Sequence, residues 1–150
     1  MKVLVFKKCE DTDKGLLSKL FVKADSLFPI PLSHKQDLNL LSNKLLDNGI
    51  VVGSYYKNEL VGAICGYAND TENGRAYVSV LCVLPEFQGN SIAKTLVGKF
   101  VQECRTVGMK SVFLYTHKTN IPAQRLYEKA GFKKETDENR PEDFSYTLLL

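Results

Sequence analysis

Two segments of this 150-residue chain combine residue types that could carry chemistry. In the first, residues 78–96, an apolar strand-like run ends at Pro85, and the small residues Gly89, Asn90 and Ser91 lead into a helical pattern. The free N–H groups of a helix's first turn and the positive end of its dipole favour a bound anion, such as a phosphate. A plain turn between a strand and a helix has the same local pattern and is the more frequent case.

The second segment, residues 116–132, places a polar side chain and a tyrosine on a short predicted helix. Asn120 follows a strand-like run, and the helix carries Leu126 and Tyr127 before it stops at Gly131 and Phe132. A tyrosine hydroxyl can donate a proton in general acid catalysis. By periodicity alone, however, such a tyrosine is more often an aromatic residue of the core or its rim. Neither segment is decisive by itself.

Together, in this order and at this separation, the segments resemble two motifs of the GNAT acetyltransferase superfamily, and the resemblance covers roughly residues 50–133. The first motif, Arg or Gln, two residues, Gly, one residue, then Gly or Ala, is matched by Gln88, Gly89, Asn90, Ser91, Ile92 and Ala93. Ser91 is a departure, because the family most often has glycine there. The second motif is matched in full by Asn120, Ala123, Leu126, Tyr127, Gly131 and Phe132.

The resemblance implies an α/β (α+β) fold with three layers, a single GNAT domain over residues 1–150. Its mixed central sheet of six or seven strands would be flanked by about four helices. It also implies acetyl-CoA as co-substrate, whose pantetheine arm would pair with free backbone groups of a splayed fourth strand. The cofactor-binding residues implied in this way are Leu81, Cys82, Val83, Gln88, Gly89, Asn90, Ser91, Ile92, Ala93, Lys94, Asn120 and Lys129.

For catalysis, the resemblance implies that Tyr127 protonates the departing CoA thiolate during direct transfer of the acetyl group. Cys82 has apolar neighbours and no evident partner base, so we do not expect it to be a nucleophile. The base that deprotonates the acceptor amine stays open. The alternatives are Tyr77, Ser79, His117, His34 and a chain of water molecules.

Acceptor specificity in this fold usually comes from the first two helices and the loop between them, here residues 24–37. This loop is mixed rather than acidic, which weakens the case for polycationic acceptors. The stretch FPIPLSHKQDLNLLSNKLLDNG, with the later YAND, resembles small acetyltransferases encoded with surface-polysaccharide genes. A small amine is therefore the expected acceptor, and an amino sugar is the candidate that this resemblance suggests. The rival interpretations are an enzyme that acetylates a protein N-terminus or lysine, and a non-catalytic acyl-CoA-binding module, against which Tyr127 argues.

The hydropathy pattern also predicts the order of elements. The expected strands and helices are a strand over 2–8, a helix with Leu16 to Ala24 on one face, a helix from near Ser33 to Asn48, an antiparallel meander of strands at 50–56, 60–68 and 75–84, a helix over 91–107, a strand over 111–115, a helix over 122–130 and a strand over 145–150. An extra strand near Phe132 is an open alternative.

Composition limits the other function classes. The net charge of +3 is scattered along the chain, so no nucleic-acid partner is expected, and no apolar run approaches the ~20 residues of a membrane span. Without a secretory signal pattern, a cytoplasmic location is the expectation. The four cysteines are widely separated and the two histidines form no cluster, so we expect reduced thiols and no metal. The apolar last strand FSYTLLL suggests pairing with a second subunit in a homodimer.

Overall fold

A computed structural model describes residues 2–89 and 91–150 of the chain. Within these residues, seven strands form one sheet in the order β1-β2-β3-β4-β5-β7-β6, with four α-helices packed around it. The elements are β1 (Val5–Lys8), α1 (Lys14–Ala24), α2 (Leu38–Asn48), β2 (Ile50–Tyr56), β3 (Glu59–Tyr67), β4 (Arg75–Val83), α3 (Ile92–Thr106), β5 (Ser111–His117), α4 (Ile121–Lys129), β6 (Lys133–Thr136) and β7 (Asp143–Leu149).

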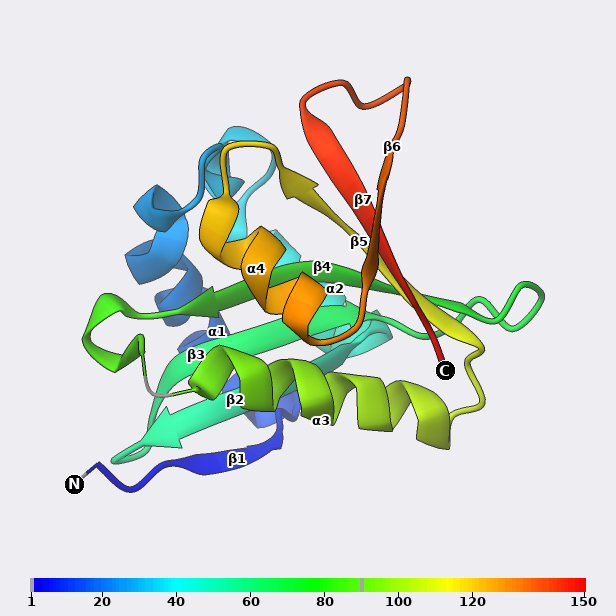
Figure 1. The fold of residues 1–150 in the computed structure, drawn as a ribbon. Coiled ribbons are helices and arrows are strands. Elements are labelled where there is room, and N and C mark those ends of the chain that lie inside the picture. The colour runs from blue at the N-terminus through cyan, green and yellow to red at the C-terminus, as the bar shows by residue number, and fades with distance from the viewer. Residues whose placement is uncertain (1, 90) are drawn as a thin grey trace.

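The helices cover both faces of the sheet, which gives the three layers expected from the sequence. In Figure 1, α3 and α4 lie on the near face, and α1 and α2 lie behind the sheet. Helix α1 packs against α2 and β3, whereas α3 packs against β2, β3 and β4. The expected fold class, a mixed sheet of six or seven strands flanked by about four helices, is confirmed.

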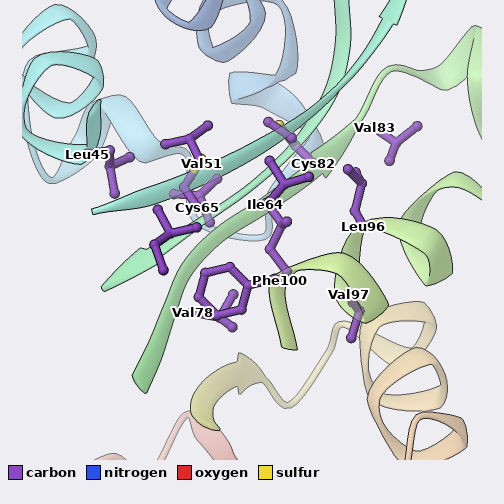
Figure 2. Close-up of a cluster of buried hydrophobic side chains, with 14 of the residues drawn as sticks. Leu45, Val51, Ile64, Cys65, Val78, Cys82, Val83, Leu96, Val97 and Phe100 are labelled. Atoms are coloured by element: carbon purple, nitrogen blue, oxygen red, sulfur yellow. The ribbon is translucent and has the colours of Figure 1, made fainter. Parts of the chain in front are cut away.

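Helix α3 supplies much of the core because its apolar residues recur every three or four positions. Figure 2 shows Leu96 and Phe100 directed from α3 toward the sheet, where Ile64 and Val78 lie. The side chains of Leu96 and Phe100 are completely buried. Burial of a side chain of this size contributes roughly 1.5–3 kcal/mol to stability. This packing fixes the start of α3 relative to the end of β4, where the first motif lies.

The meander of β2, β3 and β4 is antiparallel, as the sequence predicts. The turn between β2 and β3 consists of Lys57 and Asn58, whose φ angles of 50° and 66° are both positive. Two consecutive left-handed residues make the tight turn that matches the twist of a hairpin. In the next pair the register shifts between Cys65 and Gly66, which leaves Ser79 of β4 as an extra, bulged residue.

β4 and β5 run parallel but pair only at their first residues. The ladder joins Arg75 to Ser111, Ala76 to Val112 and Tyr77 to Phe113, and it ends there. Beyond Tyr77, β4 has no strand partner on the β5 side. The two strands therefore diverge into a V, which is the splay expected beside the fourth strand.

Some sequence-based boundaries differ from the structure. The second helix begins at Leu38 rather than near Ser33, because the Asp37 carboxylate accepts from the backbone N–H groups of Asn39 and Leu40 and caps the helix there. Residues 32–34 form a separate 3-10 turn. The extra strand near Phe132 exists as β6.

The rationale for a homodimer through the last strand was wrong. β7 lies inside the sheet, paired with β5 on one side and β6 on the other. An interior strand has no free backbone edge to offer a second subunit. The edge strands of the sheet are β1 and β6.

Two further features of the described residues concern membranes and metals. No described helix is both long and apolar enough to cross a bilayer. Residues 2–89 and 91–150 hold no group of three or more His, Cys, Asp or Glu side chains arranged around a common point. All four cysteines are free thiols and buried.

Candidate active site

A cleft of about 690 Å³ lies where β4 ends and α3 and α4 begin. It brings together residues that are almost 40 positions apart in the sequence. The predicted cofactor-binding residues that line it are Leu81, Cys82, Val83, Gln88, Gly89, Ser91, Ile92, Ala93, Lys94 and Asn120. Residues of both motifs thus line the same cleft.

The described residues on either side of position 90, just before α3, have an unusual backbone conformation. Gly89 and Ser91 both have positive φ angles, of 83° and 59°, which turn the chain sharply into the helix. The Ser91 side chain does not cap α3, although its carbonyl oxygen accepts from the N–H and the hydroxyl of Thr95. Among residues 2–89 and 91–150 no side chain caps the first turn of this 15-residue helix, and free N–H groups at such a position suit a phosphate oxygen.

Gln88 has a structural contact that its motif position did not suggest. Its side-chain Nε2 donates to the carbonyl oxygen of Val83 at 3.0 Å and ties the turn to the end of β4. That carbonyl is therefore already paired. The Leu84 N–H donates to the carbonyl oxygen of Val61 in β3, and in the same register Cys82 faces Ala63. The backbone groups of Cys82 therefore point toward β3, and those of Leu81 point toward the β5 side. Leu81, rather than Cys82, is the better candidate to pair with a bound pantetheine arm.

Two predicted cofactor-binding residues are not among the described residues that line the cleft. Asn90 lies outside the described residues. Lys129 is exposed in the last turn of α4 and lines neither the cleft nor the adjoining cavity, so its assignment as a phosphate contact is not supported. Lys94, in contrast, lines the cleft from the first turn of α3.

A second cavity, of about 190 Å³, occupies the V between β4 and β5 and is called the acceptor cavity below. Its walls come from the segment between α1 and α2, from both strands, from α4 and from the segment before β7. The cleft and the acceptor cavity share four lining residues, Phe28, Leu81, Asn120 and Ala123. The two hollows therefore meet at the divergence of the strands.

Tyr127 lines the acceptor cavity from α4. Its ring packs against Phe132 and Tyr146, with centroids 5.4 Å and 6.2 Å away, so only 4% of the residue is exposed. Burial raises the pKa of the Tyr127 hydroxyl, which keeps it protonated at neutral pH, as a proton donor must be. Asn120 caps the same helix, because its Oδ1 accepts from the backbone N–H of Ala123.

The candidates for the base that deprotonates the acceptor differ in whether they line the acceptor cavity. Tyr77, Ser79 and His117 line the acceptor cavity, whereas His34 does not. The ring of His117 is already engaged: Nδ1 lies 2.7 Å from the Thr119 hydroxyl and Nε2 lies 3.9 Å from Glu142. Burial raises the pKa of the Tyr77 hydroxyl, which opposes its use as a base at neutral pH.

Cys82 has the environment of a structural thiol. It is buried, and desolvation raises its pKa to about 12, so the thiolate is scarce at neutral pH. A thiol in this state is a poor nucleophile. This environment agrees with the expectation that Cys82 forms no acyl-enzyme.

Arg140 and Asp143 also line the acceptor cavity, and sequence reasoning missed both. They lie in and just after a charged loop whose composition is that of an ordinary solvated turn. Only the pairing of β7 with β5 brings them beside the cavity, since His117 faces Asp143 in the register. No local motif in the sequence carries that information.

Several known proteins are similar to this chain in sequence. A model of the acetyltransferase (GNAT) family matches residues 18–132. The chain is 32% identical over 88 residues to the spermine/spermidine N(1)-acetyltransferase of Bacillus subtilis, an alignment that covers 55% of this chain and 58% of that protein. It is 29% identical over 103 residues to the [ribosomal protein bS18]-alanine N-acetyltransferase of Haemophilus influenzae, with coverages of 69% and 62%.

The fold has close counterparts among solved structures. The PaiA N-acetyltransferase of Thermoplasma acidophilum, solved with coenzyme A, superposes with a TM-score of 0.77 at 20% identity and covers 99% of both chains. The chain spans less than two thirds of the length of the two curated relatives above. The family match covers most of the chain, and on that ground the chain belongs to the acetyltransferase (GNAT) family.

Proposed function

We propose that the protein transfers an acetyl group from acetyl-CoA directly to the amine of a small acceptor. The observation that carries this proposal is the meeting of the cleft and the acceptor cavity at Leu81 and Asn120, with Tyr127 beside them. A long cofactor can lie in the larger hollow while its reactive end reaches the smaller one. An acceptor in the smaller hollow then meets that end.

The cleft residues fit the parts of acetyl-CoA. The uncapped first turn of α3 would hold the pyrophosphate, with Lys94 nearby as a cation. The backbone of Leu81, which faces the β5 side and has no partner strand there, would hydrogen-bond the pantetheine arm and polarise the thioester carbonyl. The acceptor nitrogen attacks that carbonyl, the carbon–sulfur bond breaks, and the CoA sulfur takes a proton from Tyr127. The proton that the nitrogen loses on becoming an amide passes to solvent, and Tyr127 recovers its proton from solvent.

The acceptor we propose is an amino sugar. The lining is rich in neutral hydrogen-bonding groups and aromatic rings, including Tyr77, Ser79 and Tyr115. Its single carboxylate, Asp143, is paired with Arg140. A site for a polyamine would instead present unpaired negative charge. The polyamine acceptor named for the Bacillus subtilis relative is therefore less favoured here.

The first experiment measures the melting temperature with acetyl-CoA, CoA or ATP. A ligand at 100 times its dissociation constant adds about 2.7 kcal/mol of stability, a shift of several degrees in a chain of this size. Acetyl-CoA and CoA should raise the melting temperature, and ATP should not. No shift at millimolar acetyl-CoA would contradict the proposal.

The second experiment follows release of the CoA thiol with a panel of amino sugars, polyamines and peptides with free N-termini. Tyr127→Phe should lower kcat about 100-fold while the stabilisation by acetyl-CoA persists. Tyr67→Phe is the matched control, because Tyr67 lines neither hollow. Turnover of peptides alone would favour a protein acetyltransferase, and cofactor binding without turnover of any acceptor would favour a non-catalytic module.

A further inference from the structure

We propose that the acceptor carries an oxyanion, a phosphate or a carboxylate, and that Arg140 and Lys35 bind it in the acceptor cavity. This inference rests on the proposed function and narrows its substrate class. It concerns specificity, since neither residue is placed near the bond that breaks. The two side chains reach the cavity from different segments of the chain, one before β7 and one between α1 and α2.

Arg140 is held rigidly for a side chain of its length. Its guanidinium lies over the ring of Tyr115, with the central carbon 3.7 Å from the ring centroid. Nε and Nη2 each lie 3.2 Å from the same oxygen of Asp143. Stacking on one side and pairing along one edge fix the plane of the guanidinium. A planar fork fixed in this way loses little conformational freedom when it binds a ligand.

Asp143 does not use up the donor capacity of Arg140. A guanidinium has five N–H groups, and one carboxylate oxygen occupies one edge of it. Nη1 has no hydrogen-bond partner among residues 2–89 and 91–150. The free edge belongs to a residue that lines the cavity. A phosphate or carboxylate is the group whose geometry matches this fork.

Lys35 adds a second positive charge. It is exposed, lines the same cavity, and forms no ion pair with any residue that the structure describes. With Asp143 as the only carboxylate in the lining, the cavity has one positive charge in excess. An acceptor with an anionic group is attracted to such a lining, and a polycation is repelled.

The test compares 2-amino-2-deoxyglucose with its 1-phosphate, its 6-phosphate and an amino sugar that bears a carboxylate. The four probes share an amine and a ring and differ in the anion. We expect at least one anionic probe to have a kcat/KM at least about 10-fold above that of the neutral sugar, a difference of about 1.4 kcal/mol, since hydrogen bonds to charged groups are stronger than those between neutral groups. Comparison of the phosphate-bearing probes with the carboxylate-bearing probe shows which of the two anions the site prefers.

The variants Arg140→Gln and Lys35→Gln should each reduce this ratio about 10-fold, mainly through a higher KM for the anionic probe. Arg140→Lys, which keeps the charge but loses the fork, should restore part of it. Because the ratio is taken within one variant, a general loss of folded protein cancels. Arg75→Gln is the control, since Arg75 stacks on Phe113 in the same manner, 4.0 Å from the ring centroid, but does not line the cavity.

Three results would overturn the inference. In the first, the kcat/KM for the neutral sugar equals that for the anionic probes. In the second, the ratio of kcat/KM between anionic and neutral probes is unchanged in Arg140→Gln and Lys35→Gln. Either result contradicts the inference and leaves the proposed function intact. If no probe is acetylated while peptides or polyamines are, both this inference and the amino-sugar acceptor fail, although acetyl transfer itself survives.

Discussion

Ser91 combines a backbone that favours glycine with a side chain that can contact a phosphate. Its φ of 59° is left-handed, a conformation that costs a residue with a Cβ roughly 1–2 kcal/mol. This explains in physical terms why glycine is the common residue at this motif position. The helix α3 still begins at Ile92, so the packing of α3 against the sheet compensates for the strain.

Replacement of Ser91 tests that balance. Ser91→Gly should relieve the strain of the positive φ in the folded protein, but it also gives the unfolded chain more conformational freedom. Because the two effects oppose each other, we expect a free energy of unfolding that is between zero and roughly 1 kcal/mol above that of the wild type. Ser91→Ala keeps the strain and removes only the hydroxyl. Urea unfolding measures the first effect, and stabilisation by CoA measures the second. If Ser91→Gly proved clearly less stable than Ser91→Ala, the left-handed conformation would not be a source of strain.

Among the elements, the segment between α1 and α2 shapes the acceptor cavity through one polar contact. Asp25 accepts from the backbone N–H of Ser33 at 2.9 Å and from its hydroxyl at 2.5 Å. These hydrogen bonds lower the pKa of the Asp25 carboxyl, so they persist into mildly acidic solution. They close the loop that carries Phe28 and Leu32 into the cavity wall.

Removal of that contact should affect the acceptor and leave the cofactor largely alone. Asp25→Ala should raise the KM for the acceptor severalfold, because the wall formed by Phe28 and Leu32 loses its closure, with little change in the KM for acetyl-CoA. Steady-state kinetics with each substrate varied in turn make the measurement. Asp70→Ala is the control, since Asp70 accepts in the same way from Asn73 in a loop away from both hollows. Equal effects of the two variants would argue against a role in the acceptor wall.

The elements also separate what the sequence can predict from what it cannot. Strong periodicity predicted α3 almost to its ends, and the two strand-like runs at 50–56 and 60–68, separated by three residues, predicted the hairpin of β2 and β3. The start of α2 was misplaced because Pro29 and Pro31 interrupt the helical pattern without showing where it resumes. The insertion of β7 between β5 and β6 is a long-range pairing, and nothing local in Asp143–Leu149 announces it.

The same distinction holds for the site. Tyr127 and the turn from Gln88 to Ala93 were predictable because each lies in a compact motif. Arg140 and Asp143 were not, since the strand order alone places them beside His117. The backbone groups exposed by the splay of β4 and β5 were expected only through the resemblance, because the splay depends on where one ladder ends.

At the scale of the whole molecule, buried thiols should make stability depend on pH in alkaline solution. Burial raises the pKa of Cys9 to about 11 and the pKa of Cys104 to about 12. In the unfolded chain a thiol titrates near pH 8.5. Between roughly pH 9 and 11 the folded protein therefore binds more protons than the unfolded chain, and the free energy of unfolding falls as pH rises.

Each buried thiol lowers the free energy of unfolding by up to about 1.4 kcal/mol per pH unit in this range. Below the pKa of the thiol in the unfolded chain this loss does not occur. Urea unfolding at pH 7.5, 9 and 10 measures the slope. Cys104→Ala should be somewhat less stable at pH 7.5, because it leaves a small cavity beneath α3, yet its stability should fall less steeply with pH. The slope rather than the absolute value is the test, since packing loss shifts all three measurements equally. An unchanged slope in Cys104→Ala would mean that this thiol ionises in the folded protein as readily as in the unfolded chain, and that α3 does not shield it from water.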